Sequence, residues 1–98
     1  MSFTVTFRPE ADLDLAEAQA YLDRQESGLG REFADEIETC LLGVSRLPES
    51  FPVVSRRTRR ALVKRFPYAI FFFIDGDRIR VTAIVHQSRH PRTWRRRP

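Results

Sequence analysis

FPYAIFFFIDGDRIRVTAIVHQSRHPRTW, residues 66–94, is the stretch that decides the fold. Two segments within it, 68–74 and 78–86, are rich in apolar β-branched and aromatic residues, and the tripeptide DGD at 75–77 lies between them. The glycine of this tripeptide tolerates a positive φ, which favours the tight turn of a β-hairpin. A third segment of similar composition, 61–66, precedes the hairpin. The three segments together predict an antiparallel meander.

The last segment, 78–86, alternates apolar and polar residues with the period of a half-buried strand. On one face the pattern places Ile79, Val81, Ala83 and Val85, and on the other Arg78, Arg80, Thr82, Ile84 and His86. Arg80 and His86 are therefore expected on the same, more polar face, at a distance of roughly 20 Å along the strand. That face is expected to be left to solvent or to a partner.

The chain before Pro48 predicts one strand and two helices. Residues 2–7 alternate as a strand does, with Phe3, Val5 and Phe7 on one face and Ser2, Thr4 and Thr6 on the other. Pro9 suits the first position of a helix, and apolar residues then recur at helical spacing at Ala11, Leu15, Ala18 and Leu22. SGLG at 27–30 interrupts this helix. A second helix follows, with Phe33, Ile37, Leu41 and Val44 on one face and Cys40 beside them.

These elements define an α+β fold in the order β-α-α-β-β-β, expected as a single domain over residues 1–98. The helical hairpin should pack on one face of a small antiparallel sheet, because neither layer has another surface to bury against. Alternate aromatic residues of 68–74 must then point away from the helices. Either Phe71 and Phe73 stay open as a binding surface, or the C-terminal segment folds back and covers them with Trp94.

The charge of the chain is divided along its sequence. The formal net charge is +4, yet residues 1–46 carry four cations and ten acids, whereas residues 47–98 carry thirteen cations and three acids. The segment SRRTRRALVKRF at 55–66 holds six of these cations and no acid. Such a tract would repel itself unless an anionic partner offset it, so the C-terminal half is expected to meet a macromolecular anion.

Several classes of protein are disfavoured by the sequence. No apolar run approaches the roughly 18 residues of a membrane span, and the N-terminal residues do not have the basic and apolar regions of a secretory signal. The basic tract alternates too poorly with apolar residues to form a membrane-surface helix. One cysteine forms neither an internal disulfide nor a metal cluster. We expect a cytoplasmic protein with no cofactor, no metal and no membrane partner.

The order of these elements, together with the FPY run at 66–68 and the closing HQSRHPRTW at 86–94, resembles the RelE/ParE superfamily of toxins from bacterial type II toxin-antitoxin modules. The resemblance spans essentially the whole chain. It implies one of two activities: cleavage of messenger RNA on the ribosome, as in the RelE-like branch, or inhibition of DNA gyrase without nuclease activity, as in the ParE-like, plasmid-stabilisation branch. It also implies a small acidic antitoxin that holds the toxin inactive.

The chemistry of RNA cleavage helps to choose between these branches. Cleavage without a metal requires a base, an acid and fixed cations around the phosphate. The candidates are Glu49 or His86 as base, His86 or His90 as acid, and Arg60, Lys64 and Arg80 as clamps. The RNA-cleaving members are expected to carry an arginine where this chain has Tyr68, and a functional Tyr or His where it has Thr93, Trp94 and Arg95. These departures favour the ParE-like branch, with the nuclease and a non-specific nucleic-acid binder as alternatives.

Under the favoured hypothesis the target and the antitoxin bind the basic and aromatic residues of the C-terminal half: Arg56, Arg57, Arg59, Arg60, Lys64, Arg65, Tyr68, Arg80, His86, Arg89, His90, Arg92 and Trp94. Each has a structural alternative. The histidines fit hydrogen-bonded loop or strand-end residues, Tyr68 fits core packing with its hydroxyl at the rim, Cys40 fits a small core residue, and the arginines fit a solvated loop.

Overall fold

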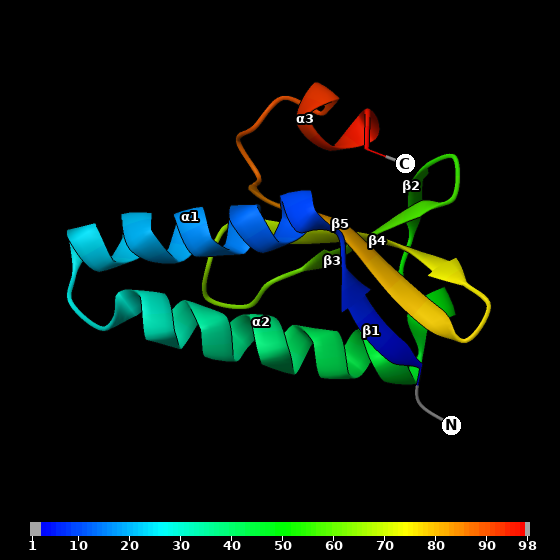
Figure 1. Cartoon of the computed structure of the whole chain (residues 1–98), viewed down its shortest axis with the longest axis horizontal. Coiled ribbons are helices and arrows are strands. Elements are labelled where there is room, and N and C mark those ends of the chain that lie inside the picture. Colours follow the sequence, from blue (N-terminus) through cyan, green and yellow to red (C-terminus); the bar gives the residue numbers. More distant parts are fainter. Residues whose placement is uncertain (1–2, 98) are drawn as a thin grey trace.

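A computed structural model describes residues 3–97 and confirms the α+β fold (Figure 1). The elements in chain order are β1 (Thr4–Phe7), α1 (Pro9–Gln25), α2 (Leu29–Arg46), a 3₁₀ turn η1 (Pro48–Ser50), β2 (Val53–Ser55), β3 (Thr58–Leu62), β4 (Tyr68–Asp75), β5 (Arg78–His86) and α3 (Arg92–Arg95). Ser2, which the sequence pattern placed in the first strand, lies outside the described residues. None of the helices within residues 3–97 is long and apolar enough to cross a membrane.

The strands form one sheet in the order β1-β5-β4-β3-β2. β2 to β5 pair in antiparallel fashion, but β1 pairs with β5 in parallel, so the sheet is mixed and not purely antiparallel as expected. The strand expected at 61–66 begins earlier, at Thr58, and ends at Leu62. The arginine tract therefore belongs partly to β3 and partly to the tight turn after β2, an edge strand that the sequence did not predict.

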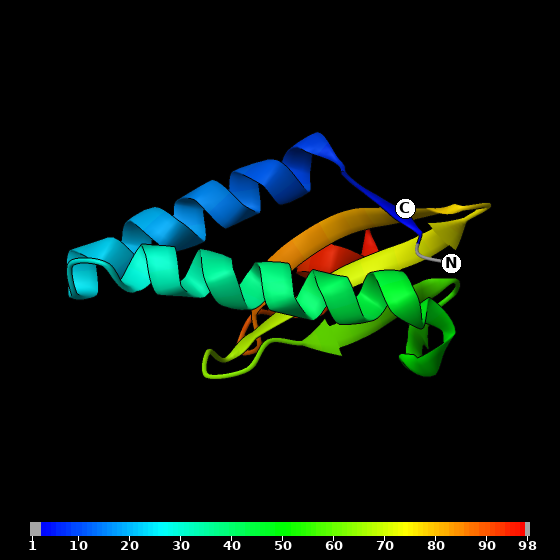
Figure 2. The same ribbon diagram turned by 90° about the horizontal axis from the view of Figure 1, so that it is seen from below.

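The helical hairpin covers one face of the sheet, as predicted (Figure 2). Ala18 and Leu22 of α1 and Phe33 of α2 are buried in a single cluster with Ile70 and Phe72 of β4. The ring of Phe33 contacts those of two residues near the start of β4, Phe66 and Tyr68, with centroids 5.2 and 4.8 Å apart. The apolar stripes of both helices thus form the main core.

A β-bulge in β5 corrects the predicted alternation of that strand. Phe71 is paired with Ala83 and Phe72 with Val81, so Thr82 is an extra residue without an opposite partner. Its side chain is 1% exposed and donates a hydrogen bond to the carbonyl of Phe71 at 3.3 Å. Beyond the bulge the faces exchange: Ile84 joins the core under the helices, whereas Ala83 and Val85 turn to the far face.

The far face of the sheet is covered and not open, contrary to the expectation of a free surface. The indole of Trp94 in α3 stacks on Phe71, with centroids 4.1 Å apart and planes inclined by 13°. Ala69, Ala83 and Val85 complete this second cluster. The guanidinium of Arg57 lies 3.9 Å above the ring of Phe73. Of the two alternatives left open by the sequence, the one in which the C-terminal segment folds back is confirmed for Phe71, whereas Phe73 is covered by Arg57 and not by Trp94.

Cys40 packs against the main core, as its place on the helical stripe predicted. Its Sγ lies 3.7 Å from the carbonyl oxygen of Leu62, and burial raises the pKa of the thiol to about 11. The neutral thiol therefore acts as a small apolar side chain.

Close contact between the two helices depends on Gly30 in the first turn of α2. Its amide donates to the carboxylate of Asp23 at 2.8 Å, and a Cβ at this position would come within 2.6 Å of the carbonyl oxygen of Gln19. A backbone atom cannot move aside as a flexible side chain can. This position therefore requires glycine, and it fixes how closely the helical hairpin closes.

We predict that Gly30→Ala lowers the free energy of unfolding by about 1–3 kcal/mol, the usual cost of overpacking. The matched control is Gly43→Ala in the same helix, where an added Cβ meets no atom within 4 Å. Gly43→Ala should raise stability by about 0.5–1 kcal/mol because alanine restricts the unfolded chain. Urea denaturation of the two variants measures both effects, and equal stabilities would contradict the proposed contact.

Candidate functional site

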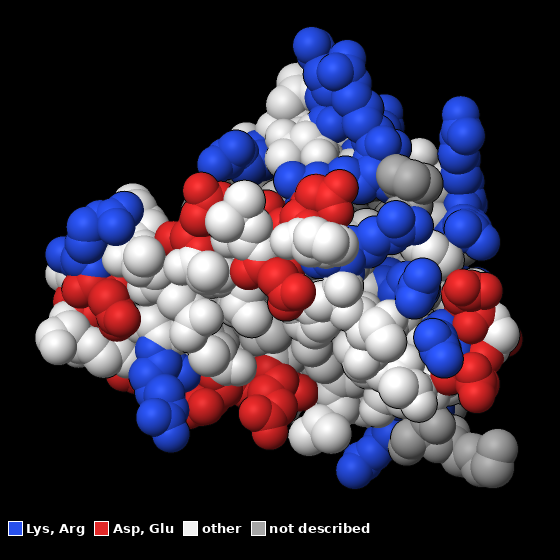
Figure 3. Space-filling view, viewed as in Figure 1, with Lys and Arg blue, Asp and Glu red and all other residues white. Residues whose placement is uncertain are grey.

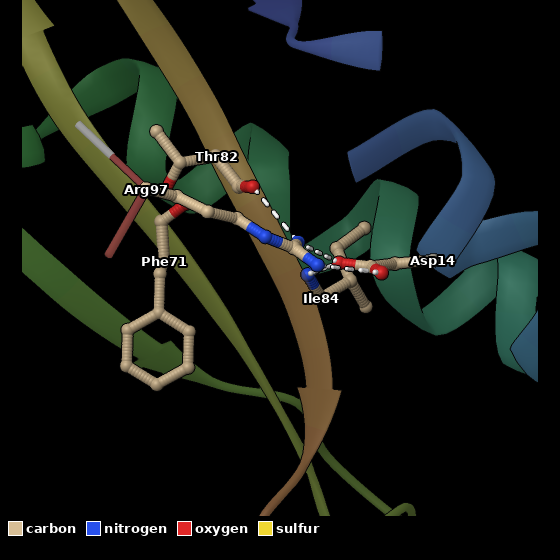
Figure 4. Close-up of polar contacts among 5 residues, drawn as sticks. All are labelled: Asp14, Phe71, Thr82, Ile84 and Arg97. Carbon is tan, nitrogen blue, oxygen red and sulfur yellow. Dashed lines mark hydrogen bonds and ion pairs between the residues drawn. The ribbon is translucent and has the colours of Figure 1, made fainter. Parts of the chain in front are cut away.

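Beyond the point where β1 ends, two side chains distant in sequence provide hydrogen-bond partners for the backbone at the open edge of β5. The carboxylate of Asp14 in α1 accepts the amide of Ile84 at 3.0 Å, and Arg97 donates to the carbonyl of Thr82 at 3.2 Å (Figure 4). Arg97 and Asp14 also form an ion pair at 2.5 Å, with both side chains mostly buried. The pair ties the end of the C-terminal segment to α1 and so holds α3 on the sheet.

A groove of about 610 Å³ opens beside this ion pair, between α1 and the segment that follows β5. Tyr21, Tyr68, His86 and Arg89 are among the residues that line it. The rings of Tyr68 and His86 pack edge to face, with their centroids 5.2 Å apart. Burial raises the pKa of the Tyr68 phenol, which therefore stays protonated near neutral pH and is a hydrogen-bond donor, not a base.

Both histidines make local hydrogen bonds that stabilise turns. Nδ1 of His86 accepts the amide of Ser88 at 3.0 Å, and Nδ1 of His90 accepts the amide of Arg92 at 3.1 Å. An accepting Nδ1 leaves the proton of a neutral imidazole on Nε2. These contacts give each ring a structural role in the loop between β5 and α3.

The residues predicted for RNA cleavage are spread over several elements and over both faces of the sheet. Arg80 is paired with Phe73 and so lies on the far face of the sheet, whereas His86 is paired with Tyr68 on the helical face. The expectation that these two share a face is wrong, and the bulge at Thr82 is the reason. Glu49 lies in η1, and Lys64 lies in the turn between β3 and β4. Among the described residues no hydrogen bond or ion pair joins any two of Glu49, Arg60, Lys64, Arg80 and His86.

The predicted binding cations divide into occupied and available groups. Arg65 pairs with Glu32 at 2.7 Å and with Glu36 at 3.4 Å, and these contacts raise its pKa. Arg59 donates to the carbonyls of Glu49 and Phe51. The exposed side chains of the following residues have no carboxylate partner within the part of the chain that the structure describes: Arg56, Arg57, Arg60, Lys64, Arg89 and Arg92.

Charge is also divided in space. Figure 3 shows Lys and Arg gathered over α3 and beside β2, and most Asp and Glu over the helical hairpin and the β4–β5 turn. The sequence missed Arg8, whose side chain reaches the far face from the end of β1 with its Cζ 6.0 Å from the centroid of Phe73. It also missed the pairing of Asp14 with Arg97. Both involve residues more than 60 positions apart, and no local pattern signals them.

A second groove, of about 420 Å³, is mainly apolar and lies between β1 and α2. Phe3, Val5 and Phe7 of the β1 region form one wall, and Ile37, Leu41 and Leu42 form the other. Leu42 is 53% exposed, which is high for a leucine beside a core. Neither the sequence pattern nor the charge indicated this groove.

The fold matches chains of solved toxin-antitoxin systems. A structure described as the chromosomal ParDE toxin-antitoxin system from P. aeruginosa superposes with a TM-score of 0.77 at 13% identity, covering 87% of this chain and 96% of that one. A chain of the toxin-antitoxin complex RelBE2 from Mycobacterium tuberculosis superposes with a TM-score of 0.64 at 22% identity, covering 88% and 99%. The molecule therefore has the fold of the RelE/ParE superfamily.

Within that superfamily, the sequence of residues 5–91 matches the model of the ParE toxin of the type II toxin-antitoxin system parDE. The chain belongs to the ParE toxin family. No curated protein sequence matches it significantly.

We predict that Asp14→Asn loosens α3, because the ion pair with Arg97 is lost and the amide of Ile84 keeps only a weaker acceptor. Trp94 is the only tryptophan of the chain, so its fluorescence reports directly on the docking of α3. The emission of Trp94 should shift to the red, and its indole should become more accessible to a neutral quencher. Glu17→Gln, which removes a neighbouring charge from the same helix, is the control and should leave both unchanged. An unshifted Asp14→Asn spectrum would show that the stack on Phe71 holds α3 alone.

Proposed function

We propose that this chain is a ParE-like toxin that inhibits DNA gyrase in the cytoplasm and is held inactive by a small acidic antitoxin, as in plasmid-stabilisation modules. The observation that carries the proposal is the placement of Arg80 and His86 on opposite faces of the sheet. A binding protein can use two separate faces, whereas a nuclease must bring its acid, base and cations to one phosphate.

The local chemistry of the groove between α1 and the C-terminal segment also argues against cleavage. A general base needs an unprotonated atom directed at the substrate, but Tyr68 stays protonated and Nδ1 of His86 is occupied by the amide of Ser88. Arg97, one of the cations that line this groove, is neutralised by Asp14. These features support a RelE-like ribonuclease less well than a toxin that acts by binding.

The apolar groove between β1 and α2 supports an antitoxin partner. Its exposed leucine and the partly buried aromatic residues of β1 suit the apolar face of an amphipathic helix. β1 is also the last strand of the sheet, so its outer edge can accept an extended segment. An acidic remainder of the same partner would complement the positive net charge of the chain. The two structural neighbours, both described as toxin-antitoxin systems, support a partner of this kind.

We predict that the purified chain stops supercoiling by gyrase and leaves translated messenger RNA intact. His86→Gln removes the only histidine in the groove beside α1, and it should retain at least half of the inhibition because no proton transfer is involved. The two assays are run in parallel on the same preparations. Cleavage of message by the wild type, together with its loss in His86→Gln, would establish the nuclease instead.

We predict that Leu42→Glu weakens capture of the antitoxin encoded beside this gene by at least tenfold. Burying a carboxylate without a cationic partner is costly, and no Lys, Arg or His is among the described residues that line the groove. Leu13→Glu is the matched control, because Leu13 is 60% exposed on α1 and does not line the groove. Pull-down of the co-expressed partner measures the effect. Equal capture by the two variants would place the antitoxin elsewhere.

A further inference from the structure

Three arginines from separate elements converge on the far face of the sheet, around the ring of Phe73. Arg8 follows β1, Arg57 lies in the turn between β2 and β3, and Arg80 lies on β5. We refer to Arg8, Arg57 and Arg80 as the arginine cluster. The residues are brought together by the parallel pairing of β1 with β5 and by the return of β2 and β3 along the other side of β4.

The aromatic ring fixes the geometry of the arginine cluster. The Cζ of Arg57 lies 3.9 Å from the centroid of Phe73, and that of Arg8 lies at 6.0 Å. Arg80 is the cross-strand partner of Phe73 and donates to the hydroxyl of Thr6 at 3.5 Å. Cation-π contact restrains the guanidiniums without neutralising them. The positive charges are therefore held in place and remain available.

The arginine cluster is only weakly compensated by the chain itself. The Nε atoms of Arg8 and Arg80 are withdrawn from solvent and have no hydrogen-bond acceptor among the described residues. One carboxylate, that of Asp75, approaches, and it lies 4.0 Å from Nε of Arg80. Exposed arginines of α3 add positive charge to the same side of the sheet: Cζ of Arg95 lies 5.5 Å from the centroid of the Trp94 ring, which stacks on Phe71. The face therefore attracts an extended anion.

The aromatic residues of the same face indicate which anion fits. Phe71 is covered by Trp94, Trp94 is itself 8% exposed, and Phe73 is covered by Arg57. Within residues 3–97, no ring on this face is free to stack on an unpaired base, which is how single strands are usually held. A duplex keeps its bases stacked inside and presents phosphates, for which guanidiniums are well suited.

We infer that the arginine cluster, together with the exposed arginines of α3, binds the sugar-phosphate backbone of double-stranded nucleic acid without reading its sequence. The inference goes beyond the proposed inhibition of gyrase and does not depend on it, because binding is a property of the purified chain alone. It assigns the two sides of the molecule to different ligands: the apolar groove beside β1 to the antitoxin, and the far face of the sheet to phosphates.

Fluorescence anisotropy with a short labelled DNA duplex of random sequence tests this inference. Affinity for the duplex should fall steeply with salt concentration. The plot of the logarithm of the association constant against the logarithm of salt concentration has a negative slope, and its magnitude should become smaller by about 0.9 for each phosphate contact removed. Arg57→Gln, on an exposed turn, should remove one such contact. The triple variant Arg8→Gln/Arg57→Gln/Arg80→Gln should lower affinity by at least a hundredfold, with Trp94 emission confirming that it is folded.

The matched control is the triple variant Arg24→Gln/Arg31→Gln/Arg46→Gln, which makes the same change of net charge on the helical hairpin. It should keep most of the affinity and the wild-type slope. Equal losses of affinity in the two triple variants would mean that binding depends on net charge alone, and this would overturn the proposed site. Asp75→Asn should raise affinity several-fold, because it removes the one carboxylate near the cluster. An unchanged or lower affinity would contradict the geometry.

Four competitors identify the source of the phosphates and the class of ligand. A DNA duplex and an RNA duplex of equal length should both displace the probe, and their ratio shows which backbone fits better. A single strand of the same length should compete at least tenfold less well. A polyglutamate peptide of equal charge should also compete poorly. Stronger competition by the single strand or by the peptide would overturn the assignment to duplex phosphates.

Discussion

One extra residue in β5 determines how the two faces of this sheet are used. The bulge at Thr82 lets the first half of the strand pack under the helices and then turns Ala83 and Val85 toward α3. The buried Thr82 hydroxyl bonds to the carbonyl of Phe71 and compensates the disrupted ladder. The carbonyl of Thr82 and the amide of Ile84 lie at the open edge of β5, where they form hydrogen bonds with Arg97 and Asp14, respectively. The second core, the docking of α3 and the separation of Arg80 from His86 all depend on this bulge.

Local patterns were sufficient to predict much of this fold. The stripes of both helices and the β4–β5 turn depend on neighbouring residues and were predicted correctly. The break between the helices was also predicted, but it spans residues 26–28 and not 27–30, because α2 already begins at Leu29. The bulge was not, because Thr82 fits the polar positions of a regular strand and leaves no sign in the sequence. The parallel pairing of β1 with β5 was missed for a different reason: it joins residues more than 70 positions apart. β2 and α3 contain three and four residues, too few for a periodic signal.

The candidate binding surfaces were less predictable than the fold. Composition identified the basic half of the chain, but it could not say which cations are occupied: Arg65 is paired with two glutamates of α2, whereas Arg57 rests on an aromatic ring. Arg8 belongs to the acidic half by sequence and to the cationic face by structure. The apolar groove beside β1 arises from the separation of α2 from an edge strand. That separation is a property of packing, which periodicity does not describe.

The covering of Phe71 by Trp94 has a consequence for how this toxin would lose its activity. Every strand is complete before residue 87, so a premature stop codon in the following loop would leave the sheet formed but strip the indole from its second apolar layer. Such a product would expose Phe71, Ala69 and Val85 together and would tend to aggregate or be degraded. Escape mutants with late nonsense codons would therefore be inactive because the protein misfolds, in addition to losing the arginines of α3.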